Sequence, residues 1–298
     1  MYLIIGGNGY LGSYLIKNIL EKTKETIVAT YHSGTPFCDN SRLIWHKTDV
    51  SKRESVQELY NHTISVADSP IKCVYLAGYI KPDDVYSNPL LAWDINIGGL
   101  VNFLSIFKKE ISCFYFASTD MAVGESINDY HFKETDAPHP VNLYGQMKLA
   151  GEQIVHSLGF NVFRFPLMLG RSLIPGRPHF IEHIERVVKN QEHFEILSDY
   201  YESSLDYNTV ASLIVEIIEK YGSCAEKTLH VCGDEKISKY EIAQRFCDTV
   251  GLDKSYLKPL ALKDCTFFKA KRCNILLDNS LLKNLLNLSK IKIMEGLK

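Results

Sequence analysis

The chain has 298 residues, of which 46% are hydrophobic and 23% charged, and its formal net charge is −2. This length suits one large α/β domain or two smaller ones, and the composition is that of a globular protein. The charge predicts no general attraction to nucleic acid or anionic membranes. The sequence contains no run of about eighteen apolar residues, so no membrane span is expected. The chain enters an apolar run at Tyr2, which leaves no room for a signal peptide and favours a cytoplasmic location.

The eight cysteines form no Cys-x-x-Cys pair, and several lie within apolar runs typical of strands. This pattern indicates buried thiols in a reducing compartment rather than disulfides or a zinc site. The ten histidines show no metal-ligand spacing either, so no metal is expected.

A glycine-rich turn opens the chain. The apolar run Tyr2–Ile5 predicts a buried strand, residues 13–20 have apolar side chains at helical spacing, and Gly6-x-x-Gly9-x-x-Gly12 joins the two. Such a turn lets a pyrophosphate approach the backbone and the positive end of a helix. Taken alone, it could equally be an ordinary turn between a strand and a helix. The cofactor contacts expected here are Gly6, Gly9, Tyr10, Leu11 and Gly12.

The second predicted strand, Glu25–Tyr31, ends where a dinucleotide site selective for NAD carries a carboxylate. Tyr31 and His32 stand there instead, so nothing repels a 2′-phosphate, although no arginine is present to bind one. The sequence therefore predicts that NADP(H) is preferred and NAD(H) possible, with Tyr31 and His32 beside the adenosine ribose.

The third predicted strand, Arg42–His46, leads to Asp49 and Val50. These two are expected near the adenine, although Asp49 could equally be a simple turn residue. Ser51 and Glu54 have the spacing of a capping box, which predicts that a helix begins there.

Two further strands are predicted, Lys72–Gly78 and Cys113–Asp120, with a long helix Leu91–Phe107 between them. Strands that alternate with helices predict a doubly wound, mostly parallel sheet of the Rossmann type. Small residues at the end of the fourth strand would let a cofactor pass close to the backbone. The further cofactor contacts expected here are Leu76, Ala77, Gly78 and the helix residue Asn96.

Tyr144 and Lys148 are four residues apart in a predicted helix that begins near residue 140, so they share one helical face. A tyrosine beside an ammonium group is a workable proton donor, because the positive charge lowers the pKa of the phenol. Thr119, at the end of the fifth strand, can bind the same substrate oxygen. The pair alone occurs often by chance, but here it follows a glycine-rich turn and a strand that ends in hydroxyl groups.

In this order the motifs resemble the extended short-chain dehydrogenase/reductases, and among them the dTDP-4-dehydrorhamnose reductase family. The resemblance rests on the glycine pattern, on Ser118-Thr119-Asp120 and on the Tyr144/Lys148 helix, and it covers nearly the whole chain. It implies that Tyr144 is the general acid, that Lys148 holds the nicotinamide ribose and that Thr119 orients the carbonyl. It also implies that Asn96 supports the proton path. Residues expected beside the nicotinamide are Phe165 and Met168.

The resemblance further implies an NAD(P)H-dependent reductase of a 4-keto nucleotide sugar, with a homodimer possible. The alternatives are an epimerase of the same fold and a non-catalytic NADP-binding regulatory subunit. Met121 stands where the similar 4,6-dehydratases carry a glutamate, which argues against dehydration. Other departures from the family pattern, at Ser203–Tyr207, Lys271, Arg272 and Ile275, fall in the predicted substrate half, so they leave the sugar open.

Residues 1–168 are expected to form the dinucleotide-binding domain, and residues 169–298 mainly the substrate-binding part, with 207–234 returning to the sheet. Arg171 and Arg177, in a proline- and glycine-rich loop, could bind a nucleotide-sugar diphosphate or could simply be solvated. Elements expected in the second half are helices Phe180–Lys189 and Val210–Ile218, a strand Thr228–Cys232, and a helix capped by Ser238 and Glu241.

Overall fold

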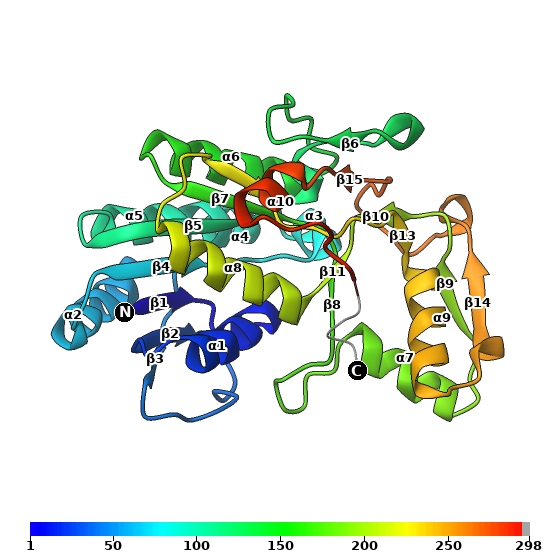
Figure 1. Cartoon of the computed structure of the whole chain (residues 1–298), viewed down its shortest axis with the longest axis horizontal. Coiled ribbons are helices and arrows are strands. Elements are labelled where there is room, and N and C mark those ends of the chain that lie inside the picture. The colour runs from blue at the N-terminus through cyan, green and yellow to red at the C-terminus, as the bar shows by residue number, and fades with distance from the viewer. Residues whose placement is uncertain (294–298) are drawn as a thin grey trace.

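A seven-stranded parallel sheet forms the centre of the structure, a computed structural model that describes residues 1–293 (Figure 1). Its strand order is β3-β2-β1-β4-β5-β7-β12, and every neighbouring pair is parallel. The doubly wound sheet predicted from the sequence is therefore confirmed. The strands are β1 (Tyr2–Ile5), β2 (Ile27–Tyr31), β3 (Leu43–Lys47), β4 (Ile71–Tyr75), β5 (Ile111–Thr119), β7 (Asn161–Phe165) and β12 (Thr228–His230).

Helices cover both faces of this sheet, and the alternation of side chains along β1 shows how. Tyr2 and Ile4 join the core formed with α1 (Tyr10–Lys22) and α8 (Tyr207–Tyr221). Leu3 and Ile5 point to the other face and join the core formed with α2 (Arg53–Val66), α5 (Gly99–Phe107) and α6 (Leu143–Ser157). Strands buried on both faces are typical of parallel sheets, which explains the continuous apolar runs in the sequence.

The long helix predicted over Leu91–Phe107 begins earlier and is interrupted. It consists of α4 (Pro89–Trp93), a π-helical turn Asp94–Gly98 and α5. Within residues 1–293, the run Pro89–Phe107 is the one helix that could cross a membrane by length and composition. The run is partly buried: Phe103 and Phe107 pack in the core beside the sheet, whereas Leu90 and Val101 are exposed.

The second half of the chain adds a smaller part beside the carboxyl ends of the strands (Figure 1). There α7 (Phe180–Lys189) and α9 (Lys239–Val250) pack on the strand pair β9 (Phe194–Leu197) and β14 (Leu257–Leu260) around a core of their own. However, α8 packs on α1, and β12 pairs with β7 in the main sheet. That the first part binds the dinucleotide and the second the substrate stays a prediction. Residues 294–298, which belong to the second part, lie outside the described residues.

Short elements complete the fold. Three two-stranded pairs are β6 (His131–Phe132) with β15 (Leu276–Leu277), β8 (Met168–Leu169) with β11 (Leu205–Asp206), and β10 (Tyr201–Glu202) with β13 (Ile237–Ser238). The remaining helices are α3 (Pro82–Ser87), α10 (Ser280–Leu286), and the 3-10 turns η2 (Asp120–Ala122), η3 (Ile127–Asp129), η4 (Lys254–Tyr256) and η5 (Leu262–Asp264).

One predicted helix cap is wrong and the other is confirmed. Helix α2 begins at Arg53, and neither Ser51 nor Glu54 caps it, because the Ser51 amide and hydroxyl both donate to Asp49 Oδ1, at 3.0 and 2.8 Å. In contrast, Ser238 and Glu241 form the expected reciprocal cap of α9.

A buried ion pair joins α6 to the sheet. Arg164 on β7 donates from Nε to Glu152 Oε1 at 2.9 Å and from Nη2 to Glu152 Oε2 at 2.7 Å. The Ser118 hydroxyl also donates to this carboxylate. This bidentate arrangement satisfies both oxygen atoms of a fully buried carboxylate, as a buried charge requires.

We expect Glu152→Gln to lower the free energy of unfolding by about 3–5 kcal/mol, because the Arg164 guanidinium would remain buried without its counter-charge. Asp248→Asn is the matched control, since the pair of Asp248 with Lys254 is exposed, and it should cost less than about 1 kcal/mol. Urea unfolding measures both values. Equal losses in the two variants would contradict the role given to the buried pair.

Candidate active site

Helix α6 lies unusually close to the end of β5, and a glycine makes this possible. A Cβ atom added to Gly145 would lie 2.2 Å from the carbonyl oxygen of Met121, which is impossible without a backbone shift. The helix starts at an Asn142 cap whose side-chain oxygen accepts from the Gly145 amide at 3.0 Å. The first turn of α6, which carries Tyr144, is therefore held against the segment that follows Thr119.

Thr119 is the last residue of β5 and is almost fully buried. Its hydroxyl donates to Asp120 Oδ1 at 2.9 Å and accepts from the Met121 amide at 3.3 Å. Thr119 lies opposite Phe165, the last residue of β7, so both stand at the carboxyl edge of the sheet. In open α/β sheets, ligands bind at this edge.

Lys148 is 3% exposed, and its ammonium group donates to the carbonyl oxygen of Ala117 at 2.7 Å. The same nitrogen lies 4.6 Å from the centre of the Phe116 ring and 6.0 Å from that of Tyr144. Burial lowers the pKa of Lys148 to about 8, and the Glu152 carboxylate opposes this shift. At neutral pH the side chain therefore still carries its charge.

Tyr144 differs from expectation in its acidity. Burial raises the pKa of its phenol. The prediction that Lys148 lowers the pKa of Tyr144 is wrong for the protein alone, because the loss of solvation outweighs an ammonium group already engaged by Ala117. The phenol is thus fully protonated at neutral pH, which suits a proton donor.

The glycine-rich turn has the properties of a pyrophosphate site. A Cβ on Gly12 would lie 2.5 Å from the carbonyl oxygen of Gly6, so α1 could not pack this closely with any larger residue. The N-terminus of α1 has no side-chain cap and no acidic residue in its first turn, which includes Tyr10 and Leu11. The first amide groups of α1 are therefore available to an anion, and the turn fits a dinucleotide. Gly9, which precedes the helix, donates its amide to Gly6 O at 3.1 Å.

Asn96 lies in the π-helical turn and fastens the loop that follows β4. Its Oδ1 accepts from the Tyr79 amide at 2.7 Å, and its Nδ2 donates to the Tyr79 carbonyl at 3.1 Å. A Cβ on the neighbouring Gly78 would lie 2.9 Å from Asn96 Oδ1 and 3.7 Å from Lys148 Nζ. Asn96, Gly78 and Lys148 are therefore adjacent, and both polar groups of Asn96 are engaged by backbone.

The other predicted cofactor contacts are distributed along the same edge of the sheet. Tyr31 ends β2, and His32 follows it, exposed, with Nε2 3.9 Å from Asp49 Oδ2. The other oxygen of Asp49 forms the turn with Ser51, so the turn role left open by the sequence is present. Val50 follows in the same loop, Leu76 and Ala77 follow β4, Phe165 ends β7 and Met168 begins β8.

The two loop arginines behave differently. Arg171 is paired with Glu185, at 2.7 Å. Arg177 instead reaches the glycine-rich turn, where Nη1 donates to the Asn8 carbonyl at 3.2 Å and the guanidinium lies 5.3 Å from the centre of the Tyr10 ring. Within the described residues Arg177 pairs with no carboxylate, so its other donors remain available beside this turn.

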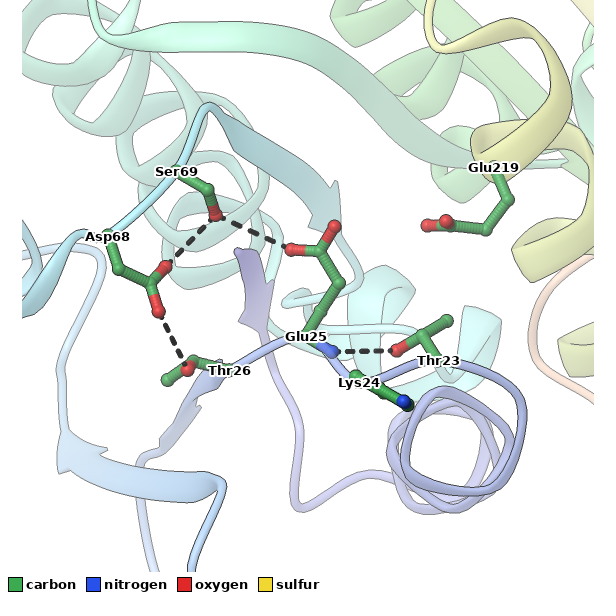
Figure 2. Close-up of a pocket in the computed structure, with 7 residues that line it drawn as sticks. All are labelled: Thr23, Lys24, Glu25, Thr26, Asp68, Ser69 and Glu219. Carbon is green, nitrogen blue, oxygen red and sulfur yellow. Dashed lines mark hydrogen bonds between the residues drawn. The ribbon is translucent and has the colours of Figure 1, made fainter.

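A surface depression of about 440 Å³ lies at the opposite, amino end of the strands (Figure 2). Its polar groups bind one another: the Ser69 hydroxyl donates to Asp68 Oδ1 at 3.0 Å, and the Thr26 hydroxyl to Asp68 Oδ2 at 3.2 Å. None of the predicted site residues lines it, and we assign it no role. The lining residues are Thr23, Lys24, Glu25, Thr26, Asp68, Ser69 and Glu219.

Comparison with known families decides the assignment. The family model described as "RmlD substrate binding domain" matches residues 1–297. The chain belongs to this family. The resemblance drawn from the sequence motifs is thereby confirmed.

Two curated relatives of different kinds are similar to the chain. Methionine adenosyltransferase 2 subunit beta of Mus musculus is 27% identical over 271 residues, which is 87% of this chain and 74% of the relative. The probable low-salt glycan biosynthesis reductase of Haloferax volcanii is 24% identical over 268 residues, which is 89% of this chain and 85% of the relative.

Solved structures share the fold over nearly the whole chain. A hypothetical dTDP-4-dehydrorhamnose reductase from Sulfolobus tokodaii has a TM-score of 0.80 at 21% identity and covers 100% of this chain and 99% of its own. The corresponding Bacillus anthracis enzyme, in complex with NADP, has a TM-score of 0.78 at 20% identity, covering 97% and 94%. UDP-glucose 4-epimerase from Thermotoga maritima, with UDP-glucose, has a TM-score of 0.81 at 20% identity, covering 99% and 95%.

Several residues of the site were not predicted from the sequence. Gly145 stands between Tyr144 and Lys148, but nothing in the sequence shows which neighbour excludes a side chain there. Glu152 and Arg164 are twelve residues apart and meet only because β7 lies beside α6. Asp120 enters the prediction only as part of the Ser118-Thr119-Asp120 motif, which assigns no role to its carboxyl group beside the predicted catalytic hydroxyl.

We expect Gly145→Ala to lower the free energy of unfolding by about 1–3 kcal/mol, because the new methyl group overlaps the Met121 carbonyl. Gly98→Ala is the control, since its Cβ would meet the movable Asp94 side chain at 3.3 Å and the Trp93 carbonyl only at an ordinary contact distance of 3.9 Å, and alanine favours a helix. Chemical unfolding of both variants measures the difference. A Gly145→Ala protein as stable as Gly98→Ala would show that α6 is not constrained at this point.

Proposed function

We propose that the protein is an NAD(P)H-dependent reductase that converts a 4-keto nucleotide sugar to the corresponding alcohol. The observation that carries the proposal is a buried, protonated Tyr144 on the helix that also carries Lys148, whose first turn packs against the segment after Thr119 at the carboxyl edge of the sheet. The family and the related structures, which include a reductase bound to NADP, support the reaction class. The proposal places the enzyme in the cytoplasm and allows a homodimer.

Each residue has a distinct task in this proposal. The reduced nicotinamide, when bound, supplies the hydride for the carbonyl carbon. Tyr144 gives its proton to the carbonyl oxygen, and the Thr119 hydroxyl donates a hydrogen bond to the same oxygen as negative charge develops. The Lys148 ammonium stabilises the phenolate that remains and holds the ribose. Asn96 keeps the Gly78–Tyr79 loop beside Lys148 by binding the Tyr79 backbone.

A preference for NADP(H) follows from the absence of a carboxylate at the end of β2. Tyr31 and His32 stand there, and His32 is exposed and 3.9 Å from Asp49. Neither of these two residues carries a negative charge to repel a 2′-phosphate, but the Asp49 carboxylate lies close to His32 and could accept a hydrogen bond from the ribose of NAD(H). NAD(H) therefore remains usable.

A second function, that of a non-catalytic NADP-binding regulatory subunit, is favoured by the similarity to methionine adenosyltransferase 2 subunit beta. An epimerase of the same fold is the third possibility, and it would retain tightly bound NAD after purification. A reductase consumes added NADPH in proportion to the ketone reduced, and a regulatory subunit turns over no nucleotide sugar. A screen of NADPH oxidation against 4-keto nucleotide sugars, made in situ by a dehydratase, separates the three.

Tyr144→Phe should bind NADPH as tightly as the unchanged protein and reduce the 4-keto sugar at least about a hundredfold more slowly, because the general acid is lost. Tyr130→Phe, which removes an exposed hydroxyl, is the control and should retain full activity. NADPH fluorescence measures binding and NADPH absorbance measures turnover. Near-normal turnover by Tyr144→Phe would rule out the proposed proton transfer.

Arg177→Ala should weaken NADPH binding about tenfold or more, because the guanidinium could no longer donate a charge-assisted hydrogen bond to the cofactor phosphates at the glycine-rich turn. Arg186→Ala, which removes an exposed arginine of α7, should leave the dissociation constant unchanged. Isothermal titration calorimetry with NADPH alone provides both values. If Arg177→Ala impaired the nucleotide sugar and not NADPH, the arginine would belong to the substrate site.

A further inference from the structure

Two buried carboxyl groups contact each other behind Thr119, and the mechanism proposed above uses neither. Asp120, in η2, is 2% exposed, and Glu202, in β10, is 4% exposed. The two carboxyl groups lie close enough to affect each other: a hydrogen bond from Asp120 would favour the ionised form of Glu202, and the charge of Glu202 disfavours the ionised form of Asp120. Two ionised carboxylates this deeply buried would repel each other, and Asp120 Oδ2 has no donor among the described residues, so we infer that the pair holds a proton.

The surroundings show which member carries the proton. Glu202 Oε1 accepts from the Tyr200 hydroxyl at 3.2 Å, and the charges of Lys239 and Arg272 favour its ionised form. Asp120 Oδ2, in contrast, is buried and meets no donor among the described residues. A carboxylate oxygen without any donor is costly in the interior, whereas a protonated one can donate to Glu202.

The charges around the pair agree with this distribution. Burial raises the pKa of both carboxyl groups, and the negative charge of Glu202 raises the pKa of Asp120 further. The other titratable or charged groups that face the pair are Tyr144 on α6, Tyr200 before β10, Lys239 on α9, Cys232 after β12, and Arg272 and Cys273 before β15.

We propose that Asp120 holds the shared proton and donates it in a hydrogen bond to an ionised Glu202, so that Glu202 is a positioning residue that keeps Asp120 neutral beside Thr119 and Tyr144. The catalytic consequence of this inference rests on the proposed function. The existence of the proton does not.

The consequence concerns the direction in which the Thr119 hydroxyl points. It now donates to Asp120 Oδ1 at 2.9 Å. An ionised Asp120 would hold that hydrogen strongly, but a neutral carboxyl is a weaker acceptor and lets the hydroxyl turn to a substrate oxygen. A neutral Asp120 also places no negative charge beside Tyr144 when the phenol gives up its proton. Both effects favour reduction.

The proton itself is tested by stability. A carboxyl group whose pKa is raised by folding releases its proton on unfolding, so the protein loses stability as pH rises above the unfolded value of about 4. We divide the equilibrium constant for folding of the unchanged protein by that of Asp120→Asn. This ratio should fall by up to about tenfold per pH unit between about pH 5 and 8. Glu195→Gln, which alters an exposed carboxylate of β9, should give a constant ratio.

The catalytic role is tested by an asymmetry between two variants. Asp120→Asn is permanently neutral, and its amide can donate to Glu202, so it should retain turnover within about threefold. Glu202→Gln offers an amide donor to Asp120 and so stabilises the ionised form, which should lower kcat about tenfold or more and leave NADPH binding unchanged. Equal losses in the two variants would show that the pair is only structural.

Infrared spectroscopy keeps the inference testable if a variant folds poorly. At pH 8 the unchanged protein should show the carbonyl stretch of a protonated carboxylic acid, and Glu202→Gln should lose it. Absence of this band, or a constant ratio of folding constants for Asp120→Asn, would overturn the shared proton even if the enzyme reduces its ketone. Conversely, if the band were present but the protein turned over no 4-keto sugar, the shared proton would stand and the proposed function would be wrong.

Discussion

The close packing of α6 on the sheet is the constraint on which the rest of the site depends. At its first turn the helix touches the Met121 carbonyl through Gly145, and two turns later Glu152 is fixed by Arg164 and Ser118. Two contacts along one rigid helix fix both its position and its rotation. Tyr144 and Lys148 lie between them, so these two contacts place both residues relative to β5, and the Lys148 ammonium adds its own hydrogen bond to the Ala117 carbonyl.

The position of α6 also decides the acidity of the groups it carries. Burial pushes the phenol of Tyr144 and the ammonium of Lys148 toward their neutral forms, which raises one pKa and lowers the other, to about 8. The pKa values of the two groups, which are close together in water, are thereby driven apart. A protonated phenol that can pass its proton to an oxyanion next to a retained positive charge is suited to reduction.

The fold was predictable from the sequence because its determinants are local. Apolar runs bounded by glycine and helical spacing between them identify each strand and helix, and the parallel order follows from their alternation. The failed cap at Ser51 has a local competitor, the Asp49 carboxylate, which pattern spacing alone cannot weigh. Contacts such as Asp120 with Glu202 join distant residues, and their protonation depends on burial that no sequence window contains. The raised pKa of Tyr144 was mispredicted for the same reason.

Membership of the family does not by itself settle what the protein does, since its relatives include both a probable reductase and a subunit of methionine adenosyltransferase. The fold and the glycine-rich turn serve a protein that only binds a dinucleotide as well as one that uses it. Binding a dinucleotide does not by itself call for a buried, protonated phenol one helical turn from a buried ammonium group. Buried groups of this kind are costly to retain, and their assembly beside the turn is what favours catalysis over binding.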